Sequence, residues 1–181
     1  MSLDVVIGPM FSGKSSYVLS VVSRYSVLGI PVLVITHESD TRYAANQVVT
    51  HDGRSAPCVH AKDLDKVDIK HYDVIIVDEA QFFTNLVPFV EWAVDTHGKH
   101  VFLVGLDGDS NRRKFGEILD CIPLADRVLR LTAFCRACAD GTPGLFSYRR
   151  QGPSDRQVLV GGLTMYETLC RKCYLSLIAR A

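Results

Sequence analysis

One stretch near the amino terminus has the residue types and the spacing of a phosphate-binding loop. Residues 8–15 read Gly-Pro-Met-Phe-Ser-Gly-Lys-Ser and satisfy the pattern G-x-x-x-x-G-K-[ST]. The glycines let the backbone wrap a phosphate chain, and the amide groups at the start of a following helix attract its negative charge. The pattern predicts that Lys14 reaches the β- and γ-phosphates of a nucleotide and that the Ser15 hydroxyl binds Mg²⁺.

A second stretch supplies the carboxylates that such a loop needs. Residues 74–77 are apolar and are followed by Asp78 and Glu79, which is typical of a buried strand that delivers a metal-binding acid. Asp78 is therefore predicted to hold Mg²⁺, directly or through a water molecule. Glu79 is a candidate general base, but a glutamate at this place activates water in ATPases, so the motif alone leaves both reactions open.

Four of the six cysteines have the spacing of a zinc site. The pairs Cys135-x-x-Cys138 and Cys170-x-x-Cys173 are separated by 31 residues, and two such pairs predict tetrahedral Zn²⁺ coordination by four thiolates. Free or buried thiols and a redox pair are the alternative interpretations. The remaining cysteines, Cys58 and Cys121, are predicted to be packing thiols.

Alternating strands and helices must position these groups. Strands are expected at 3–7, 32–36, 74–79, 101–106 and 128–131, and helices at 14–25, 61–70, 85–97 and 114–121. The strands are continuous apolar runs, as in parallel sheets buried on both faces. This alternation predicts an α/β fold class, in which a P-loop NTPase-like parallel sheet is flanked by helices and followed by a small C-terminal zinc-binding domain. The polar residues 37–52 are expected to be mostly a loop at the carboxyl end of a strand, where open α/β sheets bind ligands.

The composition changes near residue 132, where long apolar runs become few. We therefore divide the chain into a P-loop nucleotide-binding α/β domain at 1–131 and a zinc-binding domain at 132–181. Because the second segment has little apolar sequence of its own, we expect it to need the metal in order to close.

The overall composition excludes several partners. Hydrophobic residues make up 48% of the chain and charged residues 22%, as in ordinary globular proteins. Lys+Arg and Asp+Glu number 20 each, so no overall basic field attracts nucleic acid or a membrane. The apolar run at 3–7 is too short for the core of a signal peptide, and no run has the length of a membrane span. We therefore expect a cytoplasmic protein that binds neither nucleic acid nor membrane.

Together these motifs resemble those of the type II thymidine kinase family over nearly the whole chain. The resemblance is carried by residues 8–15, Asp-Thr-Arg-Tyr at 40–43, Thr-His-Asp at 50–52, Asp-Glu-Ala-Gln-Phe-Phe at 78–83, Leu-Asp-Gly at 106–108, Phe115-Gly116, both cysteine pairs, and Gly-Gly at 161–162 with Tyr166. It implies transfer of the γ-phosphoryl group of ATP to the 5′-hydroxyl of thymidine, and also of deoxyuridine, with Mg²⁺ and a structural Zn²⁺. It further implies cytosolic homotetramers that are inhibited by the end product dTTP.

The resemblance also implies a role for each matching residue. Glu79 would take the proton of the 5′-hydroxyl, and Arg42 would stabilise the charge that develops during transfer, so the implied catalytic residues are Glu79, Lys14 and Arg42. The nucleotide would be held by Gly8, Pro9, Met10, Phe11, Ser12, Gly13, Lys14, Ser15, Ser16, Asp40 and Asp78. The nucleoside would be held by Met10, Phe82, Leu106, Ser147, Leu159 and Tyr166. In this family Ser147 would lie beside the 5-methyl group of thymine, and the loop between the cysteine pairs would cover the substrate as a lasso.

One position departs from the family pattern. Many relatives carry an aromatic residue two positions after the Leu-Asp-Gly motif, and Ser110 stands there in this chain. If that aromatic lines the nucleoside pocket, its loss leaves room or polarity near the base. The departure then bears on the choice of nucleoside and leaves the reaction type unchanged.

Two other functions are compatible with the same motifs. One is a P-loop ATPase whose zinc ribbon binds nucleic acid, because residues 132–181 carry 7 Lys+Arg against 3 Asp+Glu. Against it, the chain has no room for a second motor domain, and the segment lacks the interleaved aromatics of a stacking platform. The other is a nucleotide sensor without activity, which could dispense with Glu79. Apart from the resemblance, Met10, Phe82 and Leu106 would be ordinary core residues, and Asp40 with Arg42 a surface ion pair.

Overall fold

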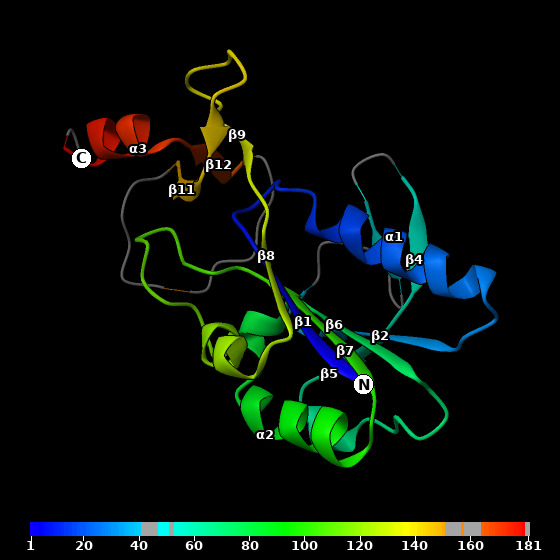
Figure 1. Cartoon of the computed structure of the whole chain (residues 1–181). Coiled ribbons are helices and arrows are strands. Elements are labelled where there is room, and N and C mark those ends of the chain that lie inside the picture. Colours follow the sequence, from blue (N-terminus) through cyan, green and yellow to red (C-terminus); the bar gives the residue numbers. More distant parts are fainter. Residues whose placement is uncertain (41–46, 51–52, 151–156, 158–163, 180–181) are drawn as a thin grey trace.

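The computed structural model describes residues 1–40, 47–50, 53–150, 157 and 164–179, and the statements below concern these residues. One sheet forms the centre, with α1 (Lys14–Val27) on one side of it and α2 (Leu86–Val90) on the other (Figure 1). The C-terminal elements lie together beyond one end of the sheet. The chain therefore has the layered arrangement of an α/β protein.

Six strands form the central sheet, in the order β5-β2-β6-β7-β1-β8. They are β1 (Ser2–Ile7), β2 (Val32–His37), β5 (Val59–Ala61), β6 (Val74–Asp78), β7 (His100–Gly105) and β8 (Arg127–Arg130). All neighbouring pairs are parallel. The carboxyl ends of these strands consequently lie at one edge, and the predicted fold class is confirmed.

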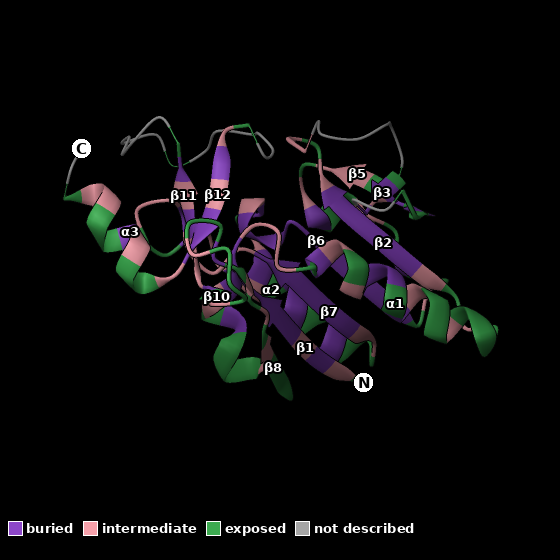
Figure 2. Ribbon diagram, turned by 90° about the horizontal axis from the view of Figure 1, so that it is seen from above, coloured by how far each residue is buried: buried purple, intermediate pink, exposed green. Residues whose placement is uncertain are grey.

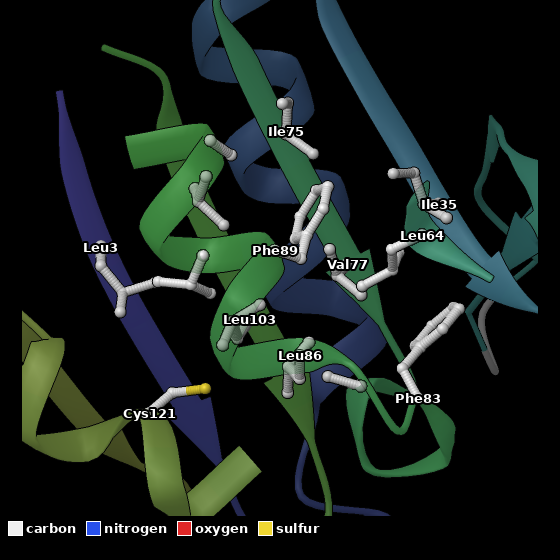
Figure 3. Packing of buried hydrophobic residues seen from close by; sticks show 14 of the residues in the cluster. Leu3, Ile35, Leu64, Ile75, Val77, Phe83, Leu86, Phe89, Leu103 and Cys121 are labelled. Atoms are coloured by element: carbon white, nitrogen blue, oxygen red, sulfur yellow. The ribbon is translucent and has the colours of Figure 1, made fainter. Parts of the chain in front are cut away.

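The alternation of side chains along each strand divides the core into two layers. Along β1, Leu3 and Val5 belong to a cluster that includes Phe89 of α2, whereas Val6 belongs to a second cluster that includes Val18 of α1. Figure 3 shows the first layer, in which Phe89 packs among buried strand residues. Because both faces of the sheet are covered, the inner strands β1, β2, β6 and β7 are largely apolar and buried on both sides, as the continuous apolar runs in the sequence predict.

All five predicted strands are present, with ends that differ from the prediction by one residue at most. The predicted helices at 14–25 and 85–97 are also present. The second consists of α2 followed by a π-helix, η3 (Glu91–Thr96). The strand at 74–79 stops at Asp78 because Glu79 takes a left-handed backbone conformation.

Two predicted helices are wrong. Residues 61–70 contain the end of β5 and only a short 3-10 helix, η1 (Leu64–Lys66). The buried residues Leu64 and Ile69 are five positions apart, a spacing that cannot place both on one face of an α-helix. Residues 114–121 enter a 3-10 helix, η4 (Ile118–Leu124), only after Gly116, whose φ of 63° interrupts a right-handed helix.

Short antiparallel ribbons account for elements that the sequence did not reveal. β3 (Gln47–Val49) pairs with β4 (Ser55–Pro57), β9 (Ala133–Phe134) pairs with β10 (Pro143–Gly144), and β11 (Phe146–Arg149) pairs with β12 (Tyr166–Leu169). Each strand has four residues or fewer, which is too short for a hydrophobic period to be recognised.

The strands β9 to β12 and α3 (Arg171–Ile178) form what we call the C-terminal unit. Its cluster of buried residues contains Cys135, Leu169 and Tyr174, with partly buried neighbours that include the other three paired cysteines. Figure 2 shows α3 as mostly exposed or half-buried, in contrast to the buried strands of the central sheet. So small an apolar core needs an additional constraint such as a metal. None of the helices in the described ranges is long and apolar enough to cross a membrane.

Candidate functional site

The phosphate-binding loop joins β1 to α1. Gly13 has a φ of 85°, and its carbonyl oxygen accepts a helical hydrogen bond from the Tyr17 amide at 2.9 Å. A left-handed backbone conformation favours glycine. Here it turns the chain so that the helix begins directly at the loop. Gly8 is required for a different reason, because a Cβ atom there would stand 2.6 Å from the Leu131 carbonyl oxygen.

Lys14 directs its charge into the loop. Its side chain is buried, and Nζ donates hydrogen bonds to the carbonyl oxygens of Gly8 at 3.1 Å and Pro9 at 2.8 Å. An ammonium group held against the loop backbone adds positive charge to a site whose helix dipole already favours anions. The arrangement suits a phosphate chain.

Oxygen-bearing side chains meet beside this loop. Ser15, Asp40 and Asp78 line one small cavity together with Thr36 and His60. A hydroxyl and two carboxylates are hard oxygen donors of the kind that Mg²⁺ prefers, so the residues present fit that ion. The structure thus brings together three residues that lie far apart in the sequence.

Thr36 is a member of this cavity that the sequence analysis missed. It pairs with Asp78 in the register of β2 and β6 and is 3% exposed. Its hydroxyl has no hydrogen-bond partner among the described residues. Because a buried hydroxyl without a partner costs about 1–3 kcal/mol, Thr36 marks a place where a bound water or ligand oxygen would be stabilised. In the sequence it is only the polar end of an apolar run.

Glu79 lies directly after β6 in a strained conformation. Its φ is 51°, which is uncommon for a residue other than glycine, and its side chain is buried. Its amide donates to Asp78 Oδ1 at 3.0 Å. The candidate base and the candidate metal ligand are therefore parts of one turn.

Gln81, in the 3-10 helix η2 (Ala80–Phe82), fixes the Glu79 carboxylate. It is 2% exposed, and its side-chain amide donates to Glu79 Oε2 at 2.6 Å while its side-chain oxygen accepts from the Leu106 amide at 2.9 Å. Two glycines leave room for it. A Cβ atom on Gly105 would stand 2.5 Å from the Gln81 side-chain oxygen, and one on Gly116 would collide with the Gln81 carbonyl. Gln81 belongs to the sequence motif at 78–83, but only its contact with Glu79 shows that it orients this carboxylate.

Aromatic rings form one wall beside the candidate base. The half-buried Phe82 ring lies 5.6 Å from the His37 ring and 5.5 Å from the Phe115 ring, centroid to centroid. Nδ1 of His37 accepts a hydrogen bond from the Ser39 amide at 3.1 Å, and burial lowers the pKa of His37. The imidazole is thus neutral at physiological pH, and this wall is an uncharged aromatic surface.

Of the other residues predicted for the nucleoside pocket, Met10 lies in the phosphate-binding loop and Leu106 directly after β7, whereas Ser147 and Tyr166 lie in the C-terminal unit. Ser147 is buried in β11, and its hydroxyl accepts a hydrogen bond from the Met10 amide at 3.0 Å. Tyr166 is buried at the start of β12, and its hydroxyl accepts from the Arg149 guanidinium at 3.3 Å. The predicted residues Arg42 and Leu159 lie outside the described residues.

The four paired cysteines form one compact cluster. Their sulfur atoms all lie within 4.8 Å of one another, and Cys138 Sγ is 3.5 Å from Cys173 Sγ and 3.8 Å from Cys170 Sγ. A tetrahedron with Zn–S bonds of about 2.3 Å has sulfur separations of about 3.8 Å, so the cluster fits zinc. Burial alone would raise the pKa of Cys135, but backbone hydrogen bonds from Cys170 and Cys138 lower it to about 7. A thiol with this pKa readily supplies a thiolate ligand.

The remaining two cysteines lie outside this cluster. Both are buried. Burial, with a smaller contribution from nearby carboxylates, raises the pKa of Cys58 to about 11 and that of Cys121 to about 12. They are protonated packing thiols, as predicted.

The fold and the site together define a class. A phosphate-binding loop at the end of one parallel strand, paired acids at the end of another and a four-cysteine cluster make this a P-loop protein with an appendage whose cysteines could hold a metal ion. The family described as thymidine kinase matches residues 1–174.

Relatives agree with that match. The chain is 42% identical to thymidine kinase a of Arabidopsis thaliana over 182 residues, which cover 97% of this chain and 75% of that protein. It is 39% identical to the thymidine kinase of rabbit fibroma virus (strain Kasza) over 174 residues, 95% of each chain. It is 38% identical to the thymidine kinase of variola virus over 175 residues, 96% of each chain. The chain therefore belongs to the thymidine kinase family and is a nucleoside kinase.

The cysteine geometry makes a prediction about thiol chemistry. We expect one zinc ion per chain and little reaction of the native protein with a thiol reagent at pH 7, since metal protects four sulfurs and raised pKa values keep Cys58 and Cys121 protonated. A chelator should release the zinc and expose only the four clustered thiols. Metal analysis and a colorimetric thiol titration test this. Fast labelling of Cys121 before chelation would contradict it.

The contact between Gln81 and Glu79 makes a second prediction. Gln81→Leu removes a hydrogen bond to a carboxylate worth about 1.5–3 kcal/mol, so kcat should fall about 10- to 100-fold. If Gln81 acts only by positioning the candidate base, the KM values for nucleoside and Mg-ATP should change little. Steady-state kinetics with a parallel thermal unfolding curve test this. A folded variant with wild-type kcat would show that the base needs no such support.

Proposed function

We propose that this chain transfers the γ-phosphoryl group of ATP to the 5′-hydroxyl of thymidine, and also of deoxyuridine, and so forms dTMP for nucleotide salvage. The observation that carries the proposal is the turn at the end of β6. There Gln81 holds the Glu79 carboxylate, and the preceding residue, Asp78, lines the same cavity as Ser15. A kinase needs a base within reach of an acceptor hydroxyl and close to the metal-bound phosphates.

The roles of the chain's residues follow from this assignment. Lys14 contacts the β- and γ-phosphates, and the residues of the loop from Gly8 to Ser16 surround them, with Asp40 beside them. Ser15 and Asp78 hold Mg²⁺, which neutralises phosphate charge when it is bound. Glu79 accepts the proton of the 5′-hydroxyl as the new oxygen–phosphorus bond forms and the bond to the β-phosphate oxygen breaks, leaving ADP. Arg42 stabilises the transferring group.

The nucleoside is proposed to bind between the two parts of the chain. Met10, Phe82 and Leu106 supply one side, and Ser147, Leu159 and Tyr166 supply the other. The aromatic wall around Phe82 supports this placement, since a pyrimidine base stacks on uncharged rings. Because the Ser147 hydroxyl is buried and accepts the Met10 amide, we propose that Ser147 limits the space beside the 5-methyl group.

Several broader properties belong to the same proposal. We divide the chain into a nucleotide-binding domain at 1–131 and a zinc-binding domain at 132–181 with a lasso loop over the substrate. We further propose a cytoplasmic homotetramer that dTTP inhibits, with structural zinc in the four-cysteine cluster. The cluster geometry supports the zinc, and the family supports the remainder. No observation favours the alternative of an ATPase with a nucleic-acid-binding ribbon.

Transfer of labelled γ-phosphate from Mg-ATP to a panel of deoxynucleosides tests the reaction. We expect labelled thymidine and deoxyuridine monophosphates. Deoxycytidine is an informative comparison, because Ser110 replaces an aromatic residue of many relatives and bears on the choice of nucleoside. Glu79→Gln keeps the shape of the side chain but cannot take a proton, so its kcat should fall about 10²- to 10⁴-fold. Hydrolysis of ATP without labelling of any nucleoside would instead favour the ATPase.

The unpartnered hydroxyl of Thr36 allows a test that separates binding from folding. Thr36→Val keeps the side-chain shape and removes a buried hydroxyl that lacks a partner among the described residues. The ligand-free protein should therefore unfold at the same temperature or a higher one, while the Mg²⁺ concentration for half-maximal activity rises about 3- to 10-fold. Calorimetry and a Mg²⁺ titration measure the two effects. A less stable variant with unchanged Mg²⁺ dependence would make Thr36 purely structural.

A further inference from the structure

Two hydroxyl groups of the C-terminal unit hold one residue of the phosphate-binding loop from both sides. Ser147 Oγ accepts a hydrogen bond from the Met10 amide at 3.0 Å, and Thr168 Oγ1 donates one to the Met10 carbonyl oxygen at 2.9 Å. Ser147 and Thr168 stand directly opposite each other in the β11·β12 ribbon, so their side chains leave the same face. Both are buried, at 5% and 3% exposure. We call this arrangement the Met10 clamp.

The clamp is built into the cysteine cluster. The Thr168 carbonyl oxygen accepts the Arg136 amide at 2.9 Å, and Arg136 lies between the first two cysteines. Cys170 follows Thr168 by two positions. The Thr168 methyl group fills a space that Gly144 leaves open, since a Cβ atom on Gly144 would stand 2.8 Å from that methyl carbon. Packing on Gly144 restricts the rotamer that points the hydroxyl at Met10.

The clamped part of the loop is strained. Phe11, the residue after Met10, has a φ of 62°, a left-handed conformation that costs a residue other than glycine about 1–2 kcal/mol. Strain of this size persists only where surrounding contacts fix the backbone. Two hydrogen bonds to the preceding residue supply such contacts, and they come from the C-terminal unit, not from the strand or helix that flank the loop.

We propose that Ser147 and Thr168 are positioning residues, through which metal bound to the cysteine cluster holds the phosphate-binding loop in the shape that binds nucleotide. The inference rests on the proposed function, because it assumes that the loop binds ATP and that the cysteines bind zinc. Loss of the clamp lowers the population of the binding shape, and the affinity for nucleotide falls by the same fraction. The zinc site thereby acts on the nucleotide site as well as on the substrate loop.

Binding of Mg-ADP without nucleoside, measured by calorimetry on zinc-loaded protein, tests the clamp. Thr168→Val and Ser147→Ala each remove one hydrogen bond, so each should weaken binding about 3- to 10-fold. Ser147→Thr keeps the hydroxyl and should bind within about twofold of wild type, whereas Thr168→Ser keeps the hydroxyl but loses the methyl group that orients it and should bind between wild type and Thr168→Val. Thr132→Val is the matched control, since Thr132 is an exposed hydroxyl just before β9. Wild-type affinity in both hydroxyl-deleted variants at full zinc content would overturn the inference.

Removal of zinc completes the test as a thermodynamic cycle. Chelation should weaken Mg-ADP binding by the wild type, and should weaken it much less in the Ser147→Ala, Thr168→Val double variant, where the connection is already broken. Equal losses in the two proteins would overturn the coupling. Should Thr168→Val lose its zinc, the comparison of Ser147→Ala with Ser147→Thr carries the same decision. If the zinc-loaded wild type binds no Mg-ADP, the proposed function itself is contradicted. If instead every variant binds Mg-ADP as tightly as the wild type, only the clamp is contradicted.

Discussion

The register of the parallel sheet is the constraint on which the candidate site depends. It sets Thr36 beside Asp78 and ends β1 next to β7, so that the phosphate-binding loop and the two acids reach the same edge. A slip of one residue in β6 would carry Asp78 to the opposite face. Each face of the inner strands packs into its own cluster of buried side chains, so a slip would disrupt the packing on both faces, and the core thereby fixes the positions of the groups at its edge.

The C-terminal unit serves the site although its own core is small. Besides the Met10 clamp, its Tyr174 hydroxyl donates to the Ser110 carbonyl oxygen at 2.7 Å, and the Arg112 guanidinium lies 4.5 Å from the centre of the Tyr174 ring. The loop that follows β7 is thus attached to the unit through backbone and cation–π contacts. Ser110 stands where many relatives carry an aromatic residue. Because the hydrogen bond from Tyr174 is to the Ser110 carbonyl oxygen, it holds the backbone there whatever the side chain is. The loop can therefore keep its course while the side chain at position 110 changes.

Sequence patterns correctly predicted those features of the fold that depend on local residue types and their spacing. Continuous apolar runs located the strands, and the loop and cysteine spacings located two clusters whose geometry the structure shows. The patterns failed where backbone conformation or distant contacts decide, as at Gly116, where positive φ prevents the expected helix. The bond between Ser147 and Met10 spans 137 positions and leaves no periodic trace. The sequence did not indicate the roles of Thr36 and Gln81 either. Thr36 lies opposite Asp78 on the neighbouring strand, and Gln81 reaches Glu79 through space that Gly105 and Gly116 leave open.

The turn after β6 shows why the two acids are adjacent in the chain. Left-handed backbone at Glu79 costs about 1–2 kcal/mol, whereas hydrogen bonds to charged groups contribute about 1.5–3 kcal/mol each. Two such bonds converge here, one from the Glu79 amide to Asp78 and one from Gln81 to the Glu79 carboxylate, so the strained turn is offset locally. A base and a metal ligand on separate elements would move independently. Joined by one peptide and one hydrogen bond, Asp78 and Glu79 keep their relative position.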